Sequence, residues 1–170
     1  AGISLAESKQ EMVYSRLARR LRATGIVSFN RYLDDLEGGR LGEEWESFTN
    51  ALTTNLTSFF REAHHFPLLA EHLKKVERMG QRAEPITIWC SASSTGEEPY
   101  SIAITACEAF NTLTPPVQIV ATDIDTNVLG VGANGVYGME RIEKVSPERQ
   151  RRFFLRGKGE QEGMVRVRPE

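Results

Sequence analysis

The 170-residue chain contains no apolar run approaching the roughly 20 residues that are needed to cross a bilayer. It has only two cysteines, too few for a disulfide framework or a four-ligand zinc site. Its net charge of −2 does not mark the whole protein as a nucleic-acid binder. The N-terminal stretch AGISLAESKQEMVYSRLARRL lacks the apolar core of a signal peptide. We therefore expect a cytoplasmic protein that is not inserted into membranes.

Metal binding is also not expected. Of the three histidines, His65 and His72 are spaced to share a helical face, next to His64. However, no third ligand follows at a spacing typical of zinc motifs. Cys107 falls within an apolar helical pattern and is expected to be a small buried residue.

The first part of the chain has the pattern of amphipathic helices. Apolar residues recur at helical spacing, as at Leu17 and Leu21. Gly25 is expected to end the first helix in a left-handed conformation, and Ser28 to cap the second. We therefore expect residues 1–52 to form an all-helical N-terminal domain.

The pattern changes after Pro85. Residues 86–90 and 117–122 are short β-branched runs, which are typical of buried strands, and residues 97–110 between them have a helical pattern. A strand, a helix and a second strand with a connection of this length form a parallel βαβ unit. Residues 164–167 are expected to be an edge strand. The fold class is therefore α/β.

The loop after the first strand, within residues 90–101, lies where open parallel sheets bind ligands. It is neither a P-loop nor a GxGxxG motif, because it has one glycine and no lysine after it. Glu97 and Glu98 begin the following helix, where they would repel a phosphate and favour a cation. Asp123 follows the second strand, where an acidic residue can hold ribose hydroxyls. A ligand that would suit both features is S-adenosylmethionine, which joins a nucleoside to a positively charged methionine group. The alternative is that both glutamates only complement the helix dipole.

These residues resemble the chemotaxis-receptor glutamate O-methyltransferase family. The resemblance is carried by TNLTSFFRE at 54–62, STGEEPYS at 94–101 and VATDIDTNVLGVGANGVY at 120–137, and the helical start is also similar. It implies an all-helical domain followed by a class I (Rossmann-like) methyltransferase domain. The implied activity is transfer of a methyl group from S-adenosylmethionine to receptor glutamates, leaving S-adenosylhomocysteine. An alternative function is a non-catalytic module of the same fold that binds S-adenosylmethionine or the receptor.

The resemblance also implies which residues form the site. By position, the cofactor would be contacted by Asn55, Thr57, Arg61, Glu98 and Asp123. Arg61 would lie near the transferred methyl group and act as the catalytic residue. From the sequence pattern alone, Asn55 and Thr57 would be interpreted as capping residues before a helix. Arg61 would be interpreted as one partner of a surface ion pair.

A strong local charge separation is hidden by the small net charge. Residues 1–33 contain six basic and two acidic residues, whereas residues 34–50 contain one basic and six acidic residues. Arg16, Arg19 and Arg20 fall on one helical face, opposite the apolar stripe. In the family this domain is thought to face the acidic methylation helices of chemoreceptors, which makes these arginines candidate partner-binding residues. The alternative is a basic face that pairs with the acidic segment behind it.

The expected organisation has three parts. Residues 1–52 form the helical domain, 53–85 a linker with the cofactor-contacting helical segment, and 86–170 the first part of the S-adenosylmethionine-binding domain. Class I methyltransferases have more strands than this pattern predicts, and the family adds a β-subdomain that recognises receptor tails. We expect both to be missing, so that the catalytic domain is incomplete at its C-terminal end and the chain alone is inactive.

Overall fold

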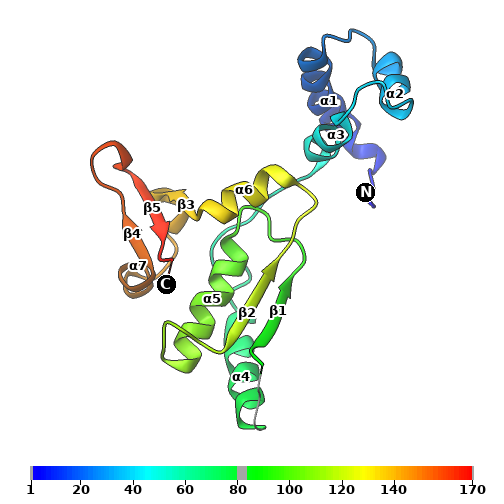
Figure 1. The fold of residues 1–170 in the computed structure, drawn as a ribbon. Helices are drawn as coiled ribbons and strands as arrows, with labels where there is room; N and C mark the ends of the chain where they lie inside the picture. Colours follow the sequence, from blue (N-terminus) through cyan, green and yellow to red (C-terminus); the bar gives the residue numbers. More distant parts are fainter. Residues whose placement is uncertain (1, 80–83, 170) are drawn as a thin grey trace. The chain divides into compact units, whose positions relative to one another are not determined.

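The computed structural model describes residues 2–79 and 84–169, which belong to two compact units (Figure 1). The first unit consists of Ala1–Thr54 with Ile124–Asn127, and the second of Asn55–Asp123 with Val128–Glu170. Residues 55–79, which were expected to act partly as a linker, therefore belong to the second unit.

The first unit is helical, as expected. Gly25 ends the first long helix with a φ of 72°, and the Ser28 hydroxyl accepts a hydrogen bond from the Arg31 amide at 3.4 Å. Both end signals predicted from the sequence are confirmed. The elements are η1 (Glu7–Lys9), α1 (Gln10–Thr24), α2 (Phe29–Glu37) and α3 (Glu44–Leu52).

A buried carboxylate organises this unit. Glu44, at the start of α3, is 9% exposed. Its carboxylate accepts hydrogen bonds from Nε and Nη2 of Arg20 at 2.8 and 2.7 Å. The hydroxyl of fully buried Tyr32 donates to the same carboxylate at 2.8 Å. The bonds from Arg20 hold the pKa of Glu44 below its usual range. One carboxylate therefore joins α1, α2 and α3.

The expected basic face on α1 is not free. Arg16 donates to the backbone oxygens of Leu52, at 3.1 Å, and Thr53, so it caps the end of α3. Arg20 is held by Glu44. The guanidinium groups of Arg16 and Arg20 thus bond within the first unit, and the pair between Arg20 and Glu44 agrees with the alternative that the basic face pairs with the acidic segment behind it. Arg19 is exposed.

The second unit contains the predicted parallel βαβ unit. Ile86 pairs with Val117 and Cys90 with Ala121, in parallel register. In Figure 1, β1 and β2 lie side by side, and α5 runs beside them. The elements are α4 (His65–Arg78), β1 (Ile86–Cys90), α5 (Glu97–Phe110), β2 (Val117–Ala121), α6 (Thr126–Asn134), β3 (Val136–Gly138), η2 (Met139–Ile142), α7 (Pro147–Phe153), β4 (Phe154–Arg156), η3 (Gly159–Gln161) and β5 (Met164–Val167).

A second, antiparallel sheet corrects one expectation. Its strand order is β3-β5-β4, so residues 164–167 form the central strand and not an edge strand. The other two strands of this sheet, β3 and β4, were not expected from the sequence. The sequence concealed them because they are only three residues long each, too short for a readable alternation.

Helix α5 is buried on two sides. On one side Ile102 joins Cys90 and Phe66, so α5 packs against β1 and α4. On another side Ile104 and Cys107 pack against residues of the antiparallel sheet. By contrast, Trp89 on β1 is 69% exposed, although parallel sheets are usually covered on both faces.

We predict that Arg20→Met destabilises the first unit by about 2–3 kcal/mol, because it leaves the Glu44 carboxylate buried without its cation. The chain has two tryptophans, of which Trp45 lies in this unit. In a Trp89→Phe background, urea unfolding followed by Trp45 fluorescence should therefore report the loss. Arg19→Met on the same helix is the matched control and should change the stability by less than about 0.5 kcal/mol. Equal effects of the two substitutions would contradict the role of Arg20.

Candidate functional site

The loop at residues 91–96 connects β1 to α5 at the carboxyl ends of the parallel strands. The Thr122 amide donates to the Cys90 carbonyl at 2.9 Å, which continues the pairing of the strands past their ends. The Ser94 amide donates to a carboxylate oxygen of Asp123 at 2.8 Å. Asp123 is therefore held beside this loop, where the sequence predicted a ribose-binding acid.

The two glutamates at the start of α5 have different environments. Glu97 is fully buried, and its carboxylate forms an ion pair with Arg141 and accepts from Thr95 Oγ1 at 2.5 Å. Glu98 is exposed. The expectation that both carboxylates present negative charge to a ligand is wrong for Glu97, because its charge is compensated inside the protein. Glu98 remains available.

The pKa of the Cys90 thiol is affected by two carboxylates near the end of β1. Burial, followed by the negative charge of Glu98 and then that of Asp123, raises the pKa of the Cys90 thiol. Both carboxylates are therefore close enough to act on the same group.

The segment 55–61 is bound to this loop and to α5 through its backbone. The Ser94 hydroxyl donates to the Asn55 carbonyl at 3.1 Å, and Arg141 Nη2 donates to the Thr57 carbonyl at 3.4 Å. The Phe60 amide donates to the Ser101 hydroxyl at 2.9 Å. The structure therefore brings the segment with three of the predicted cofactor residues next to the loop with Glu98.

The simpler interpretation of this segment was that it caps a helix. Helix α4 begins only at His65, and its N-cap residue His64 makes no side-chain capping bond. Asn55 and Thr57 are therefore not caps of α4. Arg61 is exposed, and its Nη1 donates to the Leu56 carbonyl at 2.7 Å instead of pairing with the neighbouring Glu62.

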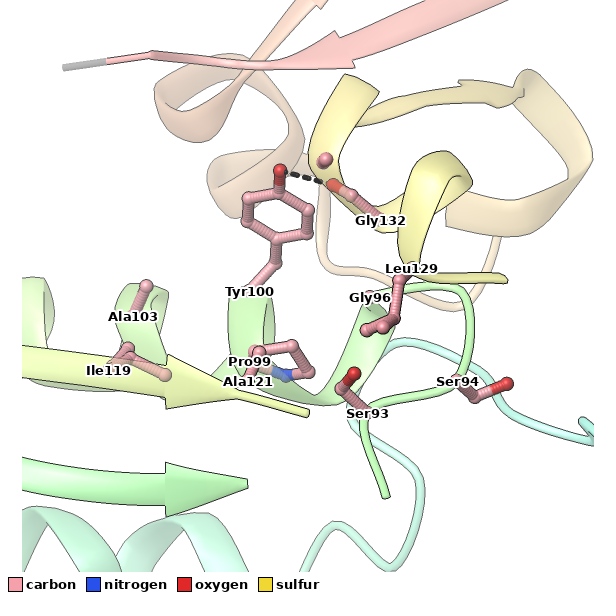
Figure 2. Close-up of a pocket in the computed structure, with 11 residues that line it drawn as sticks. Ser93, Ser94, Gly96, Pro99, Tyr100, Ala103, Ile119, Ala121, Leu129 and Gly132 are labelled. Atoms are coloured by element: carbon pink, nitrogen blue, oxygen red, sulfur yellow. Dashed lines mark hydrogen bonds between the residues drawn. The ribbon is translucent and has the colours of Figure 1, made fainter. Parts of the chain in front are cut away.

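A cavity of about 570 Å³ lies beside the loop (Figure 2). It is bounded by α5, β2 and α6, and its size is that of small-molecule sites. The Tyr100 hydroxyl at its edge donates to the Gly132 carbonyl at 2.7 Å. Neither Asp123 nor Glu98 lines it, so the cavity borders the candidate site and does not contain its carboxylates. Its lining is Ser93, Ser94, Gly96, Pro99, Tyr100, Ala103, Ile119, Ala121, Leu129, Gly132 and Ala133.

A close backbone contact fixes the turn between the loop and α5. Gly96 has a φ of 97°, and a Cβ atom there would lie 2.8 Å from both Gly132 Cα and the Tyr137 hydroxyl. That hydroxyl donates to the Thr95 carbonyl at 2.7 Å. Only glycine fits this position.

Sequence reasoning missed Tyr137, Ser101 and Arg141. Tyr137 and Arg141 come from the region of the antiparallel sheet, which was not predicted. Ser101 reads as an ordinary helical serine in the sequence. Arg141 and Glu97 are also 44 positions apart in the sequence, so no local pattern could reveal the pair.

No group of three or more His, Cys, Asp or Glu side chains that could hold a metal ion occurs among residues 2–79 and 84–169. Within the same ranges, no helix has both the length and the apolar character that a membrane span requires.

Two parallel strands joined by a helix, with an acidic residue after the second strand, are typical of the α/β folds that bind nucleosides and nucleotides at the carboxyl ends of their strands. A family model described as "CheR methyltransferase, SAM binding domain" matches residues 55–169, and one described as "CheR methyltransferase, all-alpha domain" matches residues 1–53. The chain belongs to the CheR methyltransferase family.

Curated relatives agree with this membership. The chain is 51% identical over its whole length to a chemotaxis protein methyltransferase of Salmonella typhimurium, of which it covers 57%. It is 55% identical, over 98% of its length, to chemotaxis protein methyltransferase 2 of Pseudomonas aeruginosa, of which it covers 58%. The chain thus spans little more than half the length of these relatives.

We predict that Gly96→Ala destabilises the second unit by about 3 kcal/mol or more, because the new methyl group overlaps a backbone atom in a left-handed turn. Thermal unfolding followed by circular dichroism should show the loss. Gly130→Ala, in α6, is the control, because a Cβ atom there meets nothing within 4 Å. It should be neutral or stabilising by up to about 1 kcal/mol. A stable Gly96→Ala protein would contradict the close contact.

Proposed function

We propose that the protein containing this chain transfers a methyl group from S-adenosylmethionine to glutamate side chains of chemoreceptors, leaving S-adenosylhomocysteine. The observation that carries the proposal is that Asp123, just after β2, is bound to the loop between β1 and α5, whose first turn carries the exposed Glu98, and that segment 55–61 is attached to the same loop. Membership of the CheR methyltransferase family and the names of the relatives support it.

The residues present fit this cofactor. Asp123, at the end of β2, would accept hydrogen bonds from a ribose diol, and exposed Glu98 would attract the cationic methionine end. Arg61 donates one of its five N–H groups to the Leu56 carbonyl, which leaves others for the methionine carboxylate. In this proposal Asn55 and Thr57 complete the contacts, and Arg61 is the catalytic residue beside the methyl group.

The proposed reaction requires the protein mainly to position the two reactants. The cofactor supplies a methyl group that its sulfonium already activates as an electrophile. A receptor glutamate has a pKa of about 4.3 and is ionised at neutral pH, so no general base is needed to form the nucleophile. The residues at this edge would act by orienting the reactants and excluding water, and a catalytic triad is not required.

The two other parts of the chain have proposed roles toward the receptor. The antiparallel sheet β3-β5-β4 would be the β-subdomain that the family uses to recognise receptor tails. On the helical unit, Arg19 is the exposed member of the three candidate arginines and would face the acidic methylation helices. Arg16 and Arg20 would contribute by holding α1 against α3.

We predict that Asp123→Ala raises the dissociation constant for S-adenosylhomocysteine by about 100-fold, because two charged hydrogen bonds are lost. Isothermal titration calorimetry on the full-length protein measures this change. Asp123→Asn keeps an oxygen acceptor for the Ser94 amide and should have a smaller effect. Wild-type affinity in Asp123→Ala would remove the ribose assignment, and no binding by the wild type at millimolar ligand would remove the proposed function.

We predict that Arg19→Glu slows methylation of receptor membranes, measured with a radiolabelled methyl donor, and leaves the affinity for S-adenosylhomocysteine unchanged. The reason is that reversed charge repels an acidic partner without disturbing the second unit. Lys74→Glu on α4 introduces the same charge change on an exposed position of the second unit and is the control. Equal slowing by both substitutions would argue against Arg19 as a receptor contact.

A further inference from the structure

Arg141 connects two segments that are far apart in the sequence. It lies in η2, directly after β3, and its Nη2 atom reaches both the Glu97 carboxylate and the Thr57 carbonyl. Glu97 belongs to the first turn of α5, and Thr57 to the segment 55–61. A single guanidinium group therefore ties the start of α5 to that segment.

The buried state of Glu97 explains why a cation is needed here. A carboxylate that is completely removed from water requires a charged or strongly donating partner. Thr95 supplies one neutral hydrogen bond at 2.5 Å, and Arg141 supplies the positive charge. The Arg141 side chain is 39% exposed, so it approaches Glu97 from the solvent side and closes the site over it.

The contact with Thr57 lies between two other anchors of the same segment. Ser94 holds the Asn55 carbonyl at one end, and Ser101 holds the Phe60 amide near the other end. Arg141 holds the middle, next to the side chain that the proposed function assigns to the cofactor. Loss of Arg141 would leave this part of the segment attached only at its ends.

From these contacts we propose that Arg141 is a positioning residue of the S-adenosylmethionine site. It does not touch the cofactor. By pairing with Glu97 and holding Thr57, it fixes segment 55–61 against the start of α5 and leaves Glu98 as the exposed carboxylate of that turn. The proposal rests on the proposed function for its effect on cofactor binding, but its effect on the segment is independent of it.

The test uses Arg141→Met in the full-length protein with two measurements. Without ligand, backbone amides of residues 55–61 should exchange hydrogen about tenfold faster, while those in α4 keep their rates. The dissociation constant for S-adenosylhomocysteine should rise by about tenfold, because binding of the ligand would then have to order the segment that Arg141 no longer holds. Arg141→Lys keeps the charge beside Glu97 but loses the planar fork, so it should fold normally and show smaller changes in the same direction.

Glu108→Gln is the matched control. Glu108 is also on α5 but lies near the opposite end of the helix. Its carboxylate accepts hydrogen bonds from Nε and Nη2 of Arg149 at 2.8 Å each. The substitution breaks this pair but leaves Arg149 stacked on Phe60, with the guanidinium carbon 4.1 Å from the ring centre. Because Arg149 contacts this segment through Phe60, exchange of the amides of residues 55–58 and the affinity for S-adenosylhomocysteine should both stay at wild-type values.

The outcomes separate the two proposals. Unchanged exchange in both Arg141 variants, or equal changes in Glu108→Gln, would overturn the positioning role. If the wild type binds no S-adenosylhomocysteine, the proposed function fails, and the exchange measurement still decides whether Arg141 orders the segment. Faster exchange with unchanged affinity would overturn the link to the cofactor site.

Discussion

The two-sided burial of α5 is the constraint on which the second unit depends. A helix packed on two sides must be apolar or must satisfy its polar groups internally. Ser101 is fully buried and donates to the Glu97 carbonyl at 2.6 Å, while it accepts from the Phe60 amide. Thr105 donates to the Ser101 carbonyl at 2.8 Å. The polar residues of α5 thus serve two purposes, because Ser101 also attaches the segment that precedes α4.

Ion pairs also connect elements that are distant in the sequence. The chain has nearly balanced charge, and three of its arginines are held by glutamates of other elements: Arg20 by Glu44, Arg141 by Glu97 and Arg149 by Glu108. Each pair joins two helical elements that are distant in the sequence, so these ion pairs help to fix how the elements pack. The hydrogen bonds that Arg149 donates to Glu108 also raise the pKa of Arg149, whose guanidinium group stacks on Phe60.

Local patterns predicted the parts of the fold that depend on local physics. The ends of α1 and α2, the whole of α5 and the parallel pair β1 and β2 were predicted because periodicity, capping residues and chain direction determine them. Apart from the strand at residues 164–167, the antiparallel sheet was missed because β3 and β4 have only three residues each, too few for a readable alternation. The orientation of Arg16 and Arg20 was also missed, since helical spacing gives the angle of a side chain and not the helix that packs beside it.

The same distinction applies to the candidate site. The position of Asp123 beside the loop after β1 could be predicted from the sequence, because the carboxyl ends of neighbouring parallel strands meet at one edge of the sheet. Glu97 could not be distinguished from Glu98 in this way, although one is buried and the other exposed. The difference arises from Arg141, whose position depends on the unpredicted sheet. If both carboxylates faced the loop uncompensated, their repulsion would oppose the close backbone turn at Gly96. Pairing Glu97 inside the protein therefore lets the loop close tightly and leaves Glu98 as the exposed carboxylate of this turn.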